Sequence, residues 1–136
     1  MPLTVRSPPL TALHAWAGIQ IYPWEDLTLY GYAGIEQNQA SCFGTFGYGN
    51  PASDNSGCLT PTLESFTTGT TPTCVADNRQ IVDAKIGFWQ NLYKGPMGRF
   101  VFGMELEYIK RYAFSGIGGA PSTDDTVAFS SLRYYF

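Results

Sequence analysis

The chain has few charged side chains, no surplus of basic residues and no long apolar run. Charged residues make up 14% of its 136 residues, with 8 Lys and Arg against 11 Asp and Glu. We find no basic cluster that would neutralise phosphates, so nucleic acid is not an expected partner. No apolar stretch approaches the ~18 residues of a membrane-spanning helix, which excludes an α-helical span. The aromatic content of 15% argues against intrinsic disorder.

Groups that carry catalysis or bind metals are also scarce. The chain has 1 histidine and 3 cysteines, without a CxxC pair. Neither a Ser-His-Asp arrangement nor metal-ligand spacing is indicated, so we expect no enzyme, no metal and no cofactor. Glu105 and Glu107 share one side of a predicted strand, as an acid/base pair would. Both carboxylates are better explained as charges on a water-facing side of that strand.

The cysteines indicate an oxidising compartment, because they lie in a loop-like segment that is rich in Ser, Thr, Gly and Pro. We predict a disulfide between Cys58 and Cys74, with Cys42 left as a thiol. A pairing that involves Cys42, and a chain with three reduced thiols, remain alternatives. The Cys58–Cys74 bond would close a span of 16 residues and constrain the unfolded chain by about 3 kcal/mol.

Segments that alternate between apolar and polar side chains dominate the sequence, and no 3.6-residue stripe is present. The clearest example sets Phe102, Met104 and Leu106 against Glu105 and Glu107. The sequence therefore predicts an all-β fold, an antiparallel up-and-down meander of about five long strands. The expected strands cover residues 11–22, 27–37, 79–93, 99–114 and 126–136.

These strands, about 11 to 16 residues long, exceed the usual length of 5 to 6 residues in soluble proteins. A strand that crosses a bilayer at ~45° needs about 9 to 11 residues. We therefore expect part of a transmembrane β-barrel whose apolar face meets lipid and whose polar face meets a water-filled lumen. The charged residues expected to line that lumen are Glu36, Asp83, Lys85, Glu105, Glu107, Arg111 and Arg133.

The connections between the strands alternate between tight and long. Residues 23–26 and 95–98 have turn chemistry, whereas residues 41–78 and 115–125 form long loops. Outer-membrane barrels have short periplasmic turns and long extracellular loops, and every connection fits that scheme. We expect an irregular N-terminal segment at residues 1–10, followed by the barrel portion at residues 11–136.

The last residues, Leu132-Arg133-Tyr134-Tyr135-Phe136, end in an aromatic side chain, with apolar residues alternating back from it. This pattern resembles the C-terminal strand of Gram-negative outer-membrane β-barrel proteins, in particular the C-terminal part of a porin-like barrel. The resemblance implies that Leu132, Tyr134 and Phe136 serve as the signal for the barrel-assembly machinery. It also implies a place in the bacterial outer membrane, among its lipids and lipopolysaccharide.

The number of strands departs from that family, whose single-chain barrels have an even number of at least eight. Five strands cannot close, and residues 1–10 have no apolar region typical of a signal peptide. We therefore expect the chain to be an incomplete C-terminal piece of a longer protein. The alternative is a homo-oligomer in which several chains lend strands to one barrel.

The function predicted from these features is that of a porin-like channel that passes ions or small solutes by passive diffusion. The nearly balanced lumen charges predict weak selectivity. A non-transport barrel, acting as a surface adhesin or a lipid-modifying enzyme, is the alternative function. A soluble secreted β-sandwich, which would have strands of about six residues and a covered apolar face, is a remoter alternative.

Overall fold

The computed structural model describes residues 9–43, 46–59 and 74–136. The expected N-terminal segment therefore lies largely outside the described residues. Five long strands are present, namely β1 (Ala12–Trp24), β2 (Leu27–Asn38), β5 (Asn78–Gly95), β6 (Gly98–Ala113) and β7 (Ser122–Tyr135). Two short strands, β3 (Ser41–Phe43) and β4 (Phe46–Tyr48), and a 3-10 helix, η1 (Ser56–Leu59), lie in the long connection between β2 and β5.

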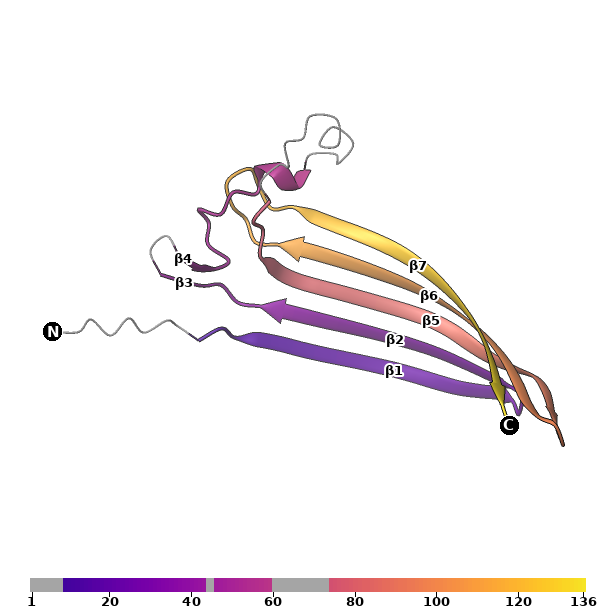
Figure 1. Ribbon diagram of the computed structural model, residues 1–136. Coiled ribbons are helices and arrows are strands. Elements are labelled where there is room, and N and C mark those ends of the chain that lie inside the picture. The colour runs from indigo at the N-terminus through magenta and orange to yellow at the C-terminus, as the bar shows by residue number, and fades with distance from the viewer. Residues whose placement is uncertain (1–8, 44–45, 60–73) are drawn as a thin grey trace, which may run out of the picture. The chain divides into compact units, whose positions relative to one another are not determined.

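The long strands form one antiparallel sheet in the order β1-β2-β5-β6-β7, so strands that are consecutive among these five pair side by side (Figure 1). This confirms the predicted all-β meander of five strands. In the described part of the chain the sheet is open, with β1 and β7 at its edges. No helix among the described residues is long and apolar enough to cross a membrane.

Contacts divide the chain into two compact units. The sheet unit consists of His14–Ile35, Val82–Lys110 and Asp124–Phe136, which are the central parts of the long strands and their tight turns. The loop unit consists of Met1–Leu13, Glu36–Ile81 and Arg111–Thr123, which include the long connections.

The apolar side chains of the sheet unit stay uncovered. Met104, Leu106 and Tyr108 on β6 are 45%, 48% and 40% exposed, whereas Glu105 and Glu107 between them are half-buried. Among all described hydrophobic residues, only Val101 and Ala113 are buried, at 6% and 4% exposure. Within the sheet unit, therefore, no second layer covers this face as it would in a β-sandwich.

Large side chains on the opposite, polar face of the sheet lie across glycines of neighbouring strands. A Cβ atom on Gly103 would collide with the ring of Trp89, and one on Gly87 would meet the ring of Tyr30 at 2.5 Å. Glycine gives an aromatic ring room to lie flat against the backbone of the next strand. These contacts explain why glycines recur within strands that otherwise favour larger residues.

The boundaries of the second long loop differ from the prediction. Residues 122–125 were expected in a loop at 115–125, but they begin β7. The Ala113 amide donates a hydrogen bond to the Pro121 carbonyl at 2.9 Å, so pairing with β6 already holds this segment. Ser, Thr and Asp are typical of loops, yet the backbone of a neighbouring strand can pair with them regardless of side chain.

The first long loop also needs correction, because it is not irregular throughout residues 41–78. Strands β3 and β4 pair there as a hairpin, with Ser41 opposite Tyr48, and Asn78 already belongs to β5. Gly47 takes a φ of +111° in this hairpin, a conformation that strongly favours glycine. The alternation in this segment is too short to be recognised as a strand from sequence.

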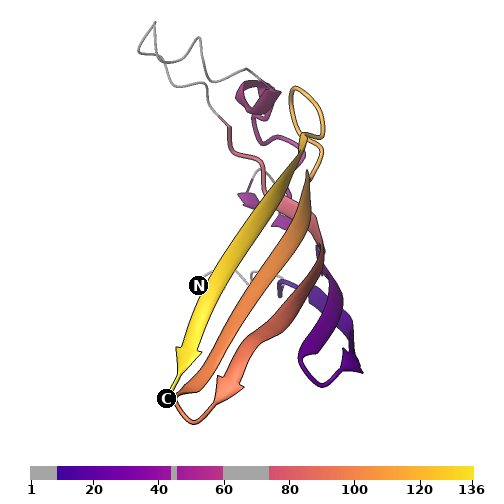
Figure 2. The same ribbon diagram turned by 90° about the vertical axis from the view of Figure 1, so that its right-hand side faces the viewer.

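The C-terminal end of β7 lies beside the tight turn between β5 and β6 (Figure 2). The Tyr134 hydroxyl donates a hydrogen bond to the Met97 carbonyl in this turn. Gly98 follows with a φ of +114°, where a side chain would be strained. The turn and the last strand therefore hold each other.

Replacing Gly103 by alanine tests the contact between ring and glycine. We expect Gly103→Ala to lower the free energy of unfolding by about 1 to 3 kcal/mol, because the new methyl group displaces the Trp89 ring. Gly31→Ala is the matched control, since its Cβ would lie 3.6 Å from Ile86 Cγ2, an ordinary contact. Urea unfolding in detergent micelles measures both, and equal effects would contradict the proposed packing.

Candidate functional site

The polar face carries a carboxylate on β6 that side chains of β5, the adjacent strand, and β2, the strand beyond it, hold in place. Tyr30 on β2 donates a hydrogen bond to Glu105 Oε2 at 2.9 Å, and Lys85 Nζ on β5 lies 3.9 Å from Glu105 Oε1. Gly87 leaves the space through which Tyr30 passes over β5 to reach β6. The charge of Glu105 is therefore balanced within the sheet.

A second contact that reaches across an intervening strand joins β5 to β7. The guanidinium carbon of Arg133 lies 4.0 Å from the centroid of the Trp89 ring, a cation–π geometry. Trp89 lies over Gly103 of the intervening strand β6. Arg133 thereby keeps its charge on the polar face while its planar group rests on an aromatic surface.

Two further predicted lumen residues, Asp83 and Glu107, also belong to the sheet unit. The carboxylate of Asp83 occupies the space above Gly34, where Asp83 Oδ1 would lie 2.5 Å from an added Cβ. Glu107 is half-buried on β6. Asp83, Lys85, Glu105, Glu107 and Arg133 thus all belong to the sheet unit, and the structure brings Lys85 and Glu105 into direct contact.

The remaining two predicted lumen residues, Glu36 and Arg111, belong to the loop unit. Asn38 donates a hydrogen bond to Glu36 Oε1 at 3.2 Å. Arg111 donates from Nε to Asn78 Oδ1 and from Nη2 to the Ala76 carbonyl, the latter at 2.9 Å. The guanidinium of Arg111 therefore holds the segment that leads into β5.

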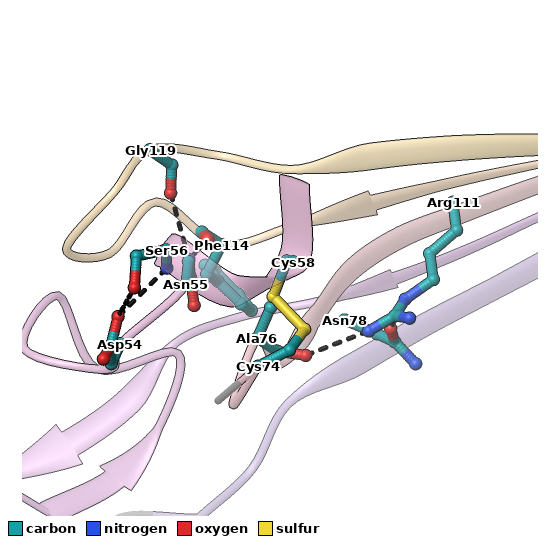
Figure 3. The surroundings of a disulfide bond; sticks show 10 residues. All are labelled: Asp54, Asn55, Ser56, Cys58, Cys74, Ala76, Asn78, Arg111, Phe114 and Gly119. Atoms are coloured by element: carbon teal, nitrogen blue, oxygen red, sulfur yellow. Dashed lines mark hydrogen bonds between the residues drawn. A yellow bond between two sulfur atoms is a disulfide. The ribbon is translucent and has the colours of Figure 1, made fainter. Parts of the chain in front are cut away.

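The loop unit is cross-linked by the predicted disulfide. Cys58 and Cys74 are bonded, with a Cα–Cα distance of 4.8 Å (Figure 3). Cys42 is an exposed free cysteine. The bond joins the 3-10 helix η1 to the segment that precedes β5. It lies close to the backbone of Ala76, which Arg111 binds (Figure 3).

Asn55 connects the two long connections within the loop unit. Its side chain, only 1% exposed, donates to the carbonyls of Phe114 at 2.9 Å and Gly119 at 3.0 Å (Figure 3). The backbone amides of Asn55 and Ile117 add hydrogen bonds to the Ile117 and Ser53 carbonyls at 2.8 and 2.9 Å. Sequence reasoning missed Asn55, because an asparagine in a loop gives no signal of burial.

Tyr48 at the end of β4 also ties the hairpin to the sequence before β5. Its hydroxyl donates to the Asn78 carbonyl at 2.6 Å, and its ring packs edge-on against Phe114 at a centroid distance of 5.8 Å. Burial raises the pKa of the Tyr48 hydroxyl, and the nearby Asp77 carboxylate adds to this increase. The hydroxyl therefore remains a donor at neutral pH.

The residues of the predicted assembly signal are all exposed. Leu132, Tyr134 and Phe136 alternate along β7 and just past its end, and the rings of Tyr134 and Phe136 meet at a centroid distance of 5.0 Å. This arrangement leaves the terminal aromatic accessible to a partner.

The described residues contain no group of three or more His, Cys, Asp and Glu side chains that could hold a metal ion. Comparisons of the chain with protein-family models, curated proteins and solved structures found no match. The function of the chain is therefore inferred from its own geometry.

Thiol labelling tests the cysteine pairing. Without a reductant, we expect a thiol reagent to modify only Cys42 in the denatured protein, and all three cysteines after reduction. A Cys58→Ser/Cys74→Ser variant should lose about 3 kcal/mol of stability, because the unfolded loop is no longer constrained. Cys42→Ser is the control and should leave stability unchanged. Labelling of all three thiols before reduction would refute the pairing.

Proposed function

We propose that the sheet forms part of a transmembrane β-barrel in the bacterial outer membrane and lines a porin-like channel for passive diffusion of ions or small solutes. The observation that carries this proposal is the uncovered apolar face, typified by Met104, Leu106 and Tyr108. The opposite face carries the paired charges Lys85 and Glu105. One face thus suits hydrocarbon and the other suits water.

The number of large exposed apolar side chains on the long strands supports a membrane environment. Its large members on the long strands include Leu13, Ile19, Ile21, Ile86, Leu92, Met104, Leu106 and Leu132. Exposed apolar surface costs about 25 cal/mol per Å² relative to an apolar environment, so the face favours burial elsewhere. Lipid supplies that environment without a second layer of protein.

The strand lengths agree with a membrane span. The long strands contain 13, 12, 18, 16 and 14 residues, whereas a tilted strand needs about 9 to 11 to cross the hydrocarbon. The surplus residues of each strand would project beyond the apolar band. Arg111, which holds the start of β5, lies in such a terminal part of β6.

The proposal requires further strands beside β1 and β7. Open sheet edges in lipid would leave backbone groups unpaired, at a cost of several kcal/mol for each group. Another part of a longer chain, or other copies in a homo-oligomer, would supply these strands. The exposed Leu132, Tyr134 and Phe136 would present the signal for barrel assembly next to lipid and lipopolysaccharide.

The loop unit favours the alternative function of a surface adhesin. The Cys58–Cys74 bond and the hydrogen bonds of Asn55 give the long connections a defined structure. Defined loops on a barrel suit recognition of an external partner. The two functions differ in whether the barrel conducts.

Site-directed labelling along β6 tests which face meets lipid. In a Cys42→Ser background, single cysteines at Met104, Leu106 and Tyr108 would carry spin labels on one face, and those at Glu105 and Glu107 on the other. In vesicles we expect the first set to collide with oxygen dissolved in lipid and the second set with a water-soluble nickel complex. Loss of this alternation would contradict the membrane orientation.

Planar-bilayer conductance tests the channel. We expect the full-length barrel to conduct with weak ion selectivity, and Lys85→Glu to shift it toward cations. Reversing a charge at contact distance in water changes the local energy by about 1 kcal/mol per unit, so the permeability ratio should change several-fold.

Lys94→Glu is the control, since it makes the same charge change at an exposed position near the β5–β6 turn. Its effect should be much smaller. An inserted barrel that passes no ions would overturn the channel proposal and favour the adhesin.

A further inference from the structure

A small cavity lies on the polar face between the two aromatic contacts. Its volume is about 150 Å³, and its walls belong entirely to the sheet unit. The side chains that define it are Tyr30, Trp89, Glu105, Phe129, Ser131 and Arg133. Sites for drug-sized ligands have volumes of ~300 to 1,000 Å³, so this cavity suits one small group.

The two charged groups of the cavity differ in how they are balanced. Glu105 accepts the Tyr30 hydrogen bond and lies 3.9 Å from Lys85. Within the described residues, Arg133 has no carboxylate within salt-bridge distance and contacts the Trp89 ring instead. An arginine stacked on an aromatic ring keeps the donors at its edge available. The cavity therefore holds a positive charge that no described carboxylate contacts, because Glu105 in its wall is paired with Tyr30 and Lys85.

The guanidinium of Arg133 is also held in place before any ligand arrives. Its plane rests on Trp89 at 4.0 Å, and Trp89 is itself fitted against Gly103. A planar fork of donors in a fixed position matches the two oxygens of a carboxylate. Preorganisation of this kind reduces the entropy lost on binding.

We propose that this cavity binds a small organic carboxylate, with Arg133 donating to both carboxylate oxygens and Ser131 available as a further donor. The aromatic side chains of Phe129 and Trp89 form apolar walls for the rest of the ligand. The inference depends on the proposed function in one respect, namely that the polar face is open to water. Small carboxylates would then be one class of solute that binds inside the channel.

Binding is tested with benzoate as the probe and the full chain in detergent micelles. The chain has 3 tryptophans, so a Trp16→Phe/Trp24→Phe background leaves Trp89 as the only one. We expect benzoate to change the Trp89 fluorescence saturably, because the ligand engages the stacked Arg133. Benzamide, which has the same shape without the charge, should give no saturable change.

Two arginine variants separate this site from general attraction of anions. Arg133→Gln should weaken benzoate binding at least about tenfold, as expected on loss of a charged bidentate contact. Arg99→Gln is the matched control, because Arg99 also stacks on an aromatic ring, Tyr135, at 4.7 Å but lies outside the cavity. It should leave binding unchanged. Equal effects of the two variants would overturn the site.

Glu105→Gln distinguishes a carboxylate from a zwitterion. Removal of the nearby negative charge should strengthen benzoate binding, whereas a site built for an ammonium group as well would bind β-alanine more weakly in this variant. Tighter binding of benzoate, with no preference for β-alanine, supports the proposal. Weaker binding of benzoate in Glu105→Gln would contradict it.

The outcomes for the cavity and for the channel can be told apart. Binding in micelles needs no conduction, so benzoate binding without bilayer conductance would refute the channel and leave the cavity in place. Conductance without saturable benzoate binding would refute the carboxylate site alone.

Discussion

Met104, Leu106 and Tyr108 lie in a row on an exposed face of the sheet unit, and nothing else in that unit covers them. An apolar surface in this state strongly favours contact with something apolar. In a soluble β protein a second sheet or a helix would supply that contact. The sheet unit offers no such layer. The fold and its function therefore depend on which medium contacts this face, lipid or water.

On the polar face, contacts within the sheet itself order the side chains, because no second layer of the sheet unit packs on them. Tyr30 and Trp89 each cross a glycine of the next strand and end at a charged residue of the strand beyond, Glu105 and Arg133 respectively. The rings replace the packing that a covering layer would give. They also keep charged groups in fixed positions, which is what a pore wall or a small binding cavity requires.

The loop unit relies on local constraints of its own. A disulfide, a buried amide and a guanidinium each join segments that are distant in sequence. Such groups compensate for the scarcity of buried apolar side chains, because each one either reduces the freedom of the unfolded chain or satisfies buried backbone carbonyls. Arg111, which is also one of the predicted lumen residues, contributes to these constraints by binding the Ala76 carbonyl.

Period-two alternation by itself determined the long strands, because it follows from how side chains leave an extended backbone. The tight turns and the meander order were likewise predictable from local signals. The Cys58–Cys74 bond was predicted as one of several alternatives, and the structure contains it. The start of β7 at Ser122 was not, since pairing with β6 decided it.

Only the tertiary structure revealed the partners of Asn55, whose acceptors lie 59 and 64 residues away in sequence. The same holds for the stacking of Arg133 on Trp89 and for the contact of Lys85 with Glu105. The face that a residue occupies is a property of its own strand. The neighbour that it meets depends on strand register, and pairing across the sheet sets that register.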